Sequence, residues 1–216
     1  EAYDYVSRQY FPPSGAMPDS LLFAAPQYNT WIELNFSQNQ QDVLRYARSV
    51  VENGLQPGVL MIDDTWQEDY GLWDFHPGRF PAPKQMVDEL HAMGFKVMLW
   101  IVPFVSPDQN LIYHDLKKHG ALLRDAVDNE PRMIRWWNGV SAVLDLSNEY
   151  AVEWFNGRRD ALVAKYGIEG FKFDAGELEY DPQGTVSEGG FSAHDQCRAS
   201  AMQGLRFSLN DYLACW

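Results

Sequence analysis

The chain has 216 residues, enough for one large domain with a single buried core. Its hydrophobic content of 46% and charged content of 22% are typical of a soluble globular protein, and no apolar run reaches the roughly 18 residues of a membrane span. The formal net charge of −13 argues against a nucleic-acid surface, because phosphate binding needs clustered Lys and Arg. We therefore expect neither a nucleic-acid partner nor a membrane partner.

The chain begins with a segment that shows no clear periodicity. Residues 1–27 are rich in Pro, Tyr and Phe, and we interpret them as a lead-in segment packed on the domain that follows. Residues 28–216 alternate apolar runs with helical patterns, which is typical of parallel βα units. Residues 30–36 are predicted to form the first strand. Ser37 is predicted to cap the first helix, with Gln40 in the capping-box position.

Two more apolar runs predict the next strands. Residues 59–62 form the second, which is followed at once by Asp63 and Asp64. A long loop over residues 65–83, dense in Trp, Tyr, Phe and Gly, leads to the next helix. Residues 96–101 are nearly all apolar and predict a third strand, buried on both faces.

The second half of the chain contains an insertion and a fourth strand. Residues 121–140 are predicted to form an irregular insertion. Asn148 then caps a long helix that Gly167 ends, and residues 170–174 form the fourth strand. Residues 195–216 have a helical pattern.

This order predicts an α/β protein, the first half of a (β/α)8 TIM barrel. A closed barrel needs eight strands, and an open half-sheet would expose an apolar edge. We therefore expect the missing C-terminal half of a longer polypeptide, or a homo-oligomer partner, to complete it. Cys197 and Cys215 are predicted to be buried or half-buried thiols in one helical stretch. The localisation stays open between a bacterial cytoplasm, a periplasm and a secretory compartment.

Acidic and aromatic residues follow the ends of three predicted strands. They are Asp63, Asp64, Trp100, Asp174 and Glu177. Because catalytic groups of parallel βα folds gather at the carboxyl ends of strands, we expect these side chains on one rim. Carboxylates can accept hydrogen bonds from sugar hydroxyls or attack an oxocarbenium-like centre, and indole faces stack on pyranose rings. The alternative for a single Asp is helix capping.

The fourth strand also carries a lysine whose place is informative. Lys172 precedes Asp174 by two residues, so both side chains lie on the same face of the strand. Phe171 and Phe173 occupy the other face, toward the helices. A lysine in a barrel interior is costly unless it is paired, and beside Asp174 it would help to keep that carboxyl ionised.

Four segments resemble glycoside hydrolase family 31. Residues 171–177, FKFDAGE, are similar to its nucleophile motif, in which an Asp after the fourth strand precedes a small residue, Gly and Glu. Residues 62–66 (IDDTW), 99–104 (LWIVPF) and 144–148 (LDLSN) resemble other parts of that family's barrel. The resemblance covers the chain from about Pro26 onward.

The resemblance implies a retaining α-glycosidase that needs no cofactor. Asp174 would be the catalytic nucleophile, which forms a covalent glycosyl-enzyme with an oligosaccharide or glycoside substrate. The residues expected to contact substrate are Asp63, Asp64, Trp66, Trp100, Trp137, Lys172 and Glu177.

The second carboxyl group that the resemblance implies has no match in this sequence. The acid/base of this family is an Asp beyond the fourth-strand motif, and a retaining pair stands about 5–5.5 Å apart. Asp195 and Asp211 are predicted to be surface or capping residues of a helix. The isolated fragment is therefore expected to be inactive.

The adjacent pair Asp63–Asp64, followed by Trp66, bears on the identity of the sugar. It is similar to the Asp–Asp–x–Trp pattern of related α-galactosidase families, whereas many α-glucosidases of family 31 carry Asp–Ile–Asp. The resemblance therefore favours an α-galactoside, with an α-glucoside as the alternative.

Two alternatives come from other functional classes. One is a non-catalytic carbohydrate-binding barrel. The other is a metal-dependent hydrolase that uses the strand-end carboxylates as ligands. We expect no metal, because no His accompanies these carboxylates at ligand spacing.

Overall fold

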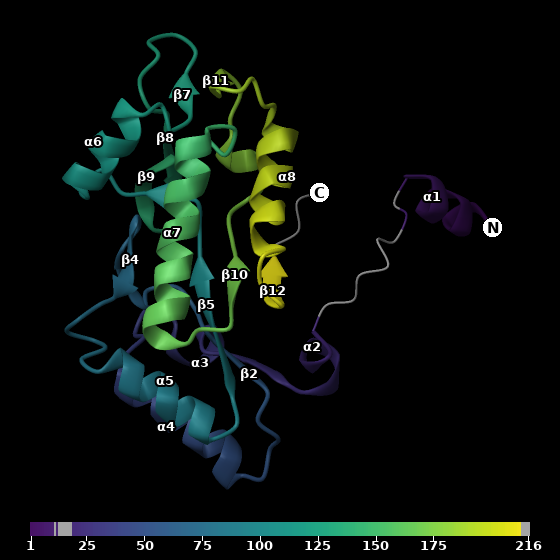
Figure 1. Ribbon diagram of the computed structural model, residues 1–216, viewed down its shortest axis with the longest axis vertical. Coiled ribbons are helices and arrows are strands. Elements are labelled where there is room, and N and C mark those ends of the chain that lie inside the picture. Colours follow the sequence, from purple (N-terminus) through teal and green to yellow (C-terminus); the bar gives the residue numbers. More distant parts are fainter. Residues whose placement is uncertain (11, 13–18, 213–216) are drawn as a thin grey trace.

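The computed structural model describes residues 1–10, 12 and 19–212. Its centre is a curled parallel sheet in the order β1-β2-β5-β10-β12 (Figure 1). These strands are β1 (Gln27–Asn29), β2 (Val59–Ile62), β5 (Lys96–Ile101), β10 (Gly170–Phe173) and β12 (Leu209–Tyr212). The predicted α/β architecture, part of a (β/α) barrel, is confirmed.

Helices cover one side of this sheet. In Figure 1, α7 and α8 run alongside β5, β10 and β12, and α4 packs beside α5. Among the described helices, none is both long and apolar enough to cross a membrane. The helices are α1 (Ala2–Tyr10), α2 (Leu21–Ala24), α3 (Trp31–Leu34), α4 (Gln40–Glu52), α5 (Pro83–Ala92), α6 (Asn110–Lys118), α7 (Glu149–Tyr166), α8 (Ala193–Gly204) and the 3-10 turn η1 (Leu178–Tyr180).

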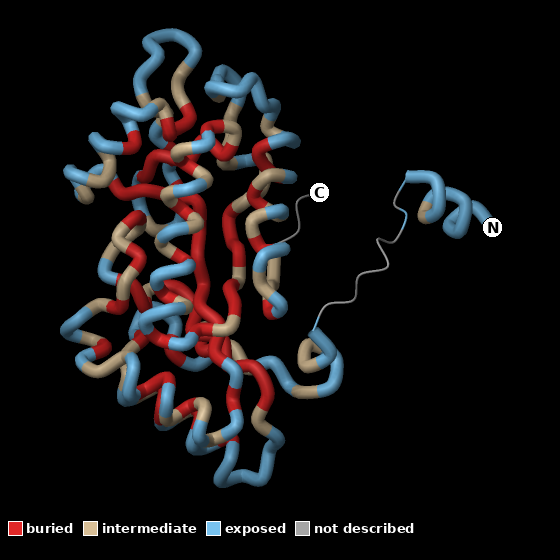
Figure 2. Tube along the Cα trace, viewed as in Figure 1, coloured by how far each residue is buried: buried red, intermediate tan, exposed pale blue. Residues whose placement is uncertain are grey.

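The central strands are the most buried part of the molecule (Figure 2). Every residue of β2 is buried, and so is every residue of β5 except Lys96. Side chains on both faces of these strands meet other apolar groups, which is why the strands read as continuous apolar runs rather than as alternating ones. The polar residues that follow each of these strands are therefore attached to a well-packed core.

The first strand lies earlier than predicted. Residues 30–36 do not form a strand, because the chain leaves the sheet after Asn29 and enters α3. The Asn29 side-chain oxygen accepts a hydrogen bond from the Trp31 amide at 2.8 Å. Asn side chains favour such local turns, which compete with extended structure. The strand β1 that does form has only three residues.

The helix caps were predicted with mixed success. Asn39, not Ser37, caps α4, and its side chain accepts from the Asp42 amide. The prediction for α7 is confirmed, because Asn148 caps its start and Gly167 ends it in the left-handed conformation at φ 82°. That φ suits glycine, which has no Cβ to clash.

Two segments predicted to lack regular structure contain antiparallel strands. The loop over residues 65–83 holds the paired strands β3 (Gln67–Asp69) and β4 (Leu72–Phe75). The segment 121–140 contributes to a three-stranded sheet in the order β6-β9-β8. The strands concerned are β6 (Phe104–Val105), β8 (Met133–Trp136) and β9 (Gly139–Val143), while β7 (Arg124–Asp125) pairs with β11 (Thr185–Val186).

The end of the described chain also differs from the prediction. Helix α8 is present, but residues 209–212 form the parallel strand β12 beside β10. A Cβ atom on Gly204 would lie 2.5 Å from the Tyr212 hydroxyl oxygen, so the chain returns directly over the helix end. Cys197 is disulfide-bonded, which corrects the prediction of a thiol there. Cys215 lies outside the described residues.

Candidate active site

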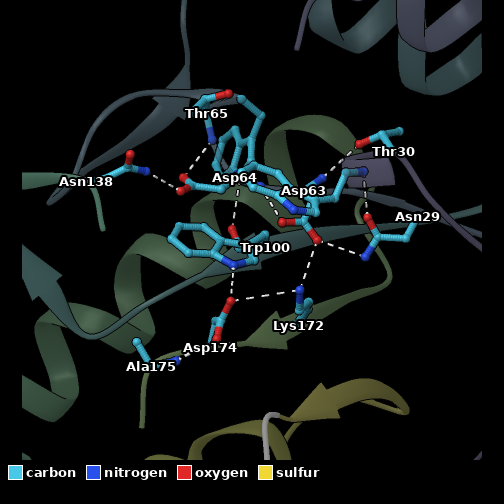
Figure 3. Close-up of polar contacts among 12 residues, drawn as sticks. Asn29, Thr30, Asp63, Asp64, Thr65, Trp100, Asn138, Lys172, Asp174 and Ala175 are labelled. Carbon is cyan, nitrogen blue, oxygen red and sulfur yellow. Dashed lines mark hydrogen bonds and ion pairs between the residues drawn. The ribbon is translucent and has the colours of Figure 1, made fainter. Parts of the chain in front are cut away.

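Three strands present their ends to one place. Asp63 follows β2, Trp100 lies near the end of β5, and Asp174 follows β10 (Figure 3). Both carboxylates are buried, with 3% of Asp63 and 6% of Asp174 exposed. The sequence therefore predicted correctly that these groups converge, because neighbouring parallel strands end at the same rim.

Lys172 joins the two carboxylates. Its Nζ lies 3.0 Å from Asp63 Oδ2 and 3.8 Å from Asp174 Oδ2. The prediction that Lys172 faces inward is confirmed, and Phe171 packs on the opposite face against Phe207. The half-buried ammonium lies between the two buried carboxylates and attracts both. The attraction also offsets part of the cost of burying these charges.

Asp174 is held by donors on each of its oxygens. The Trp100 indole N–H donates to Oδ2 at 2.6 Å, and the Ala175 amide donates to Oδ1 at 2.8 Å. Ala175 has a φ of 54°, which is sterically costly for a residue with a Cβ. The chain thus makes a strained turn immediately after the carboxylate, and this turn aims a backbone N–H at Asp174.

Asp63 is fixed by Asn29, the last residue of β1, and by Thr30, which follows it. Its Oδ2 accepts from Asn29 Nδ2 at 2.8 Å, and its backbone N–H donates to Thr30 Oγ1 at 3.1 Å. Its Oδ1 accepts from the Asp64 amide at 2.9 Å. Sequence reasoning missed Asn29 because it placed the first strand after this residue. The feature of the sequence that could have identified Asn29 is a polar side chain at the carboxyl end of a strand.

Asp64 points to a different set of partners. It accepts from the Thr65 amide at 2.6 Å, from Gln67 Nε2 at 3.0 Å and from the Tyr70 hydroxyl at 3.0 Å. Asn138 Nδ2 donates to its Oδ2 at 2.6 Å (Figure 3). Burial raises the pKa of Asp64, and the hydrogen bonds oppose that rise. The two adjacent aspartates therefore hold different parts of the structure.

The predicted tryptophan contacts differ in exposure. Trp66 is fully buried, and its indole N–H donates to the Trp100 carbonyl at 2.8 Å. Trp66 has no exposed surface and packs in the core, so its predicted contact with substrate stays a prediction. Trp137 is 47% exposed and packs against Trp136 and Tyr180 at ring-centroid distances of 4.9 and 6.1 Å.

Glu177 lies three residues after Asp174 and is poorly satisfied. Its Oε2 is buried without a hydrogen-bond partner in the part of the chain that the structure describes. Burial raises the pKa of Glu177, and the negative charge of Asp174 raises it further. This carboxyl is therefore easier to protonate than an ordinary glutamate.

Asp211 is a member of this region that sequence reasoning misplaced. It lies on β12 in register with Lys172, so the two side chains share a face of the sheet. Burial raises the pKa of Asp211, and the charge of Lys172 opposes that rise. The prediction of a helical surface residue was wrong for Asp211. It was correct for Asp195, which forms a capping box with Ser192.

Metal binding is another use that clustered acidic groups can have. Among the residues that the structure describes, no three His, Cys, Asp or Glu side chains come together so that they could hold a metal ion. What the arrangement offers is a buried, paired carboxylate at Asp174, a cation beside it and polar side chains across from it. Such a set can stabilise or attack an electron-poor carbon.

Several known proteins are similar in sequence to this chain. The Myogenesis-regulating glycosidase of Mus musculus is 34% identical over 181 residues, which is 84% of this chain and 25% of that protein. The 1,3-alpha-isomaltosidase of Kribbella flavida is 35% identical over 109 residues, 46% of this chain and 14% of the relative. The chain thus spans about a quarter or less of the length of these relatives.

Solved structures share the fold. A family 31 dextranase of Flavobacterium johnsoniae, complexed with glucose, has a TM-score of 0.75 at 18% identity, over 87% of this chain and 23% of that one. A family 31 alpha-xylosidase from a soil metagenome, complexed with xylose, has a TM-score of 0.73 at 20% identity, over 96% and 32%. Residues 16–203 match the sequence pattern of the glycosyl hydrolases family 31 TIM-barrel domain. The chain belongs to glycosyl hydrolase family 31 and forms part of its TIM-barrel domain.

Proposed function

We propose that the protein to which this chain belongs hydrolyses terminal α-glycosidic bonds with retention of configuration, and that Asp174 is its nucleophile. The observation that carries this proposal is the setting of Asp174, a buried carboxylate at the rim of the sheet with Lys172 3.8 Å away. Family membership supports a glycosidase, since the named relatives include glucosidases and xylosidases. The roles of individual residues rest on geometry.

In the first step, an Asp174 carboxylate oxygen forms a bond to the anomeric carbon while the bond to the leaving oxygen breaks. A proton from a second carboxyl group goes to that leaving oxygen. We expect this acid on the later half of the barrel, outside the present chain. In the second step, water attacks the same carbon, the second carboxylate takes its proton, and the ester bond to Asp174 breaks. The sugar therefore keeps its configuration. Lys172 and the Trp100 N–H hold Asp174 between the steps.

The other polar groups are proposed to bind the sugar. Asp63 lies across Lys172 from Asp174 and can accept hydrogen bonds from sugar hydroxyls. Glu177 is proposed to flank this position, and Asp64 to bind a sugar hydroxyl only when one of its present donors is displaced. The exposed indole of Trp137 offers a face on which a pyranose can stack. Trp100 contributes through its hydrogen bond to Asp174.

Two sugars are candidates for the cleaved unit. The α-glucoside is favoured by relatives named as alpha-glucosidases and a 1,3-alpha-isomaltosidase. The α-galactoside remains a second candidate because of the adjacent Asp63–Asp64 pair and the following Trp66. A hydroxyl that bound Asp64 would have to displace one of the donors described above, such as Asn138.

The test uses the full-length protein and aryl α-glycosides. Proton NMR of the first sugar released should show the α-anomer, as retention requires. Initial release of the β-anomer would contradict the retaining mechanism. Values of kcat/KM for the α-glucoside, the α-galactoside and the α-xyloside then rank the sugars. Binding of these sugars without turnover would support a non-catalytic carbohydrate-binding barrel instead.

A further inference from the structure

The tip of the β8–β9 hairpin is fastened to the candidate site. In this hairpin Trp136 pairs with Gly139, so Trp137 and Asn138 are the two residues of the turn. The Asn138 amide nitrogen lies 2.6 Å from Asp64 Oδ2 and 2.6 Å from the Tyr70 hydroxyl oxygen. An amide NH2 group has two hydrogens, so it can donate to both at once.

These three side chains form a closed ring of hydrogen bonds. Asn138 donates to Asp64 and to Tyr70, and the Tyr70 hydroxyl donates in turn to Asp64, at 3.0 and 3.1 Å from its two oxygens. The amide NH2 group donates twice, the hydroxyl group accepts once and donates, and the carboxylate only accepts. Burial raises the pKa of Tyr70, so its hydroxyl keeps its proton and remains a donor.

The ring has consequences for Asp64. An ionised carboxylate has about four acceptor positions. The Thr65 amide, Gln67, Tyr70 and Asn138 donate to Asp64, and the Trp137 side chain is a further hydrogen-bonding neighbour. The protein itself therefore fills the accepting capacity of Asp64. Its role in this structure is to fasten the hairpin and the loop after β2 to one point.

The hairpin tip carries the exposed aromatic residue of the site. Trp137, next to Asn138, is 47% exposed and rests edge-on against Trp136 and Tyr180. Its side chain is also one of the hydrogen-bonding groups that lower the pKa of Asp64. An indole so held has a fixed orientation, and a fixed aromatic face binds carbohydrate at a smaller entropic cost than a mobile one.

We propose that Asn138 is a positioning residue, which seats the hairpin tip on Asp64 and so fixes the Trp137 indole as a stacking surface for bound carbohydrate. The proposal rests on the proposed function, because it assumes that a sugar binds beside Asp174. It assigns Asn138 no contact with the reacting atoms. Its effect should therefore appear in substrate affinity rather than in the chemical step.

The first test measures the hairpin directly, in the full-length protein. Asn138→Ala removes both donors, and amide hydrogen exchange over residues 133–143 should become faster than in the unmodified protein. Asn110→Ala, at an exposed position at the start of α6, is the matched control and should leave that exchange unchanged. Unchanged exchange in Asn138→Ala would overturn the proposal, because the hairpin would then be held by other contacts.

The second test measures catalysis on the same variants. Asn138→Ala should raise KM for an aryl α-glycoside about tenfold, as expected for a lost hydrogen bond to a charged group, with a smaller change in kcat. In a Trp137→Ala background, the same substitution should change KM little further, because its effect acts through the indole. Faster exchange with an unchanged KM would refute the link to the substrate.

The two proposals fail in different ways. If the unmodified protein cleaves no α-glycoside, the proposed function is wrong, while the exchange measurement still decides whether Asn138 seats the hairpin. If the protein cleaves α-glycosides and Asn138→Ala behaves like Asn110→Ala, the proposed function stands and the positioning role is wrong.

Discussion

Two buried aspartates of this chain have opposite surroundings. Asp145 is completely buried, and its oxygens accept from the Ser147 amide, the Ser147 hydroxyl, Gln196 Nε2 and the Glu188 amide at 2.6–3.0 Å. All of these donors are uncharged. Asp174 accepts hydrogen bonds from Trp100 and a backbone amide and has an ammonium group nearby.

The difference separates a structural carboxylate from a candidate catalytic one. Both residues lie in segments that resemble family 31, and both are buried, so neither the motif nor the burial distinguishes them. Asp145 has as many donors as a carboxylate has acceptor positions, and it ties α8 to the segment before α7. Asp174 has a cation and, within the described part of the chain, acceptor positions left for a substrate.

The largest expected effect is on Asp174. In the full-length protein, Asp174→Ala should lower kcat by several orders of magnitude, because no other group replaces a covalent nucleophile. Added azide should restore turnover by attack from the face that the carboxylate used, and NMR should identify the product as a β-glycosyl azide. Asp88→Asn, a surface carboxylate, serves as the control and should leave kcat unchanged. Full activity in Asp174→Ala would contradict the distinction between a structural Asp145 and a catalytic Asp174.

A smaller effect, on stability rather than chemistry, is expected for Asp145. Asp145→Ala leaves four buried or half-buried donors without their acceptor, which should lower the free energy of unfolding by about 2–4 kcal/mol. Urea unfolding followed by circular dichroism measures this change. The remaining folded protein should keep far more of its kcat than Asp174→Ala does. If Asp145→Ala unfolds at the same urea concentration as the unmodified protein, the hydrogen bonds to Asp145 contribute nothing to the free energy of unfolding.

The smallest effect concerns Glu177 and depends on pH. Because its pKa is raised in the folded state, ionisation of Glu177 opposes folding. The unmodified protein should therefore lose stability relative to Glu177→Gln as the pH rises from below about 4.3, the usual glutamate value, through the raised pKa. At neutral pH, Glu177→Gln should raise the free energy of unfolding by less than about 1 kcal/mol, because solvent screens this partly exposed group.

Gln183→Ala provides the control for this titration, because Gln183 is exposed, uncharged and six residues away. Its urea midpoint should differ from that of the unmodified protein by an amount that does not grow with pH. A difference for Glu177→Gln that shrinks as the pH rises would contradict the assigned direction of the shift.

The sequence predicted those parts of the molecule that depend on local pattern. The strands β2 and β5 are apolar runs, and β10 alternates Phe with Gly and Lys. The cap at Asn148 and the stop at Gly167 follow local backbone chemistry. The shared face of Lys172 and Asp174 follows from strand alternation. These features need no knowledge of distant residues.

The missed features depend on contacts between distant segments. Strand β1 is a short run with polar residues that is extended only because β2 pairs with it. In the same way β12, which carries Asp211, is defined by its pairing with β10. Asn138 meets Asp64 across 74 positions of sequence, and nothing local to either residue indicates that contact. Tertiary pairing overrides weak local preference in each case.

The central claim is that Asp174 attacks the anomeric carbon, and covalent trapping tests it most directly. A 5-fluoroglycosyl fluoride of the preferred sugar should react with the full-length protein, which releases fluoride and leaves a slowly hydrolysed glycosyl ester. After digestion, mass spectrometry should find one added glycosyl group on the peptide that contains Asp174, and fragmentation should place it on that residue. A glycosyl group on any other carboxylate, or turnover without a covalent adduct, would contradict the claim.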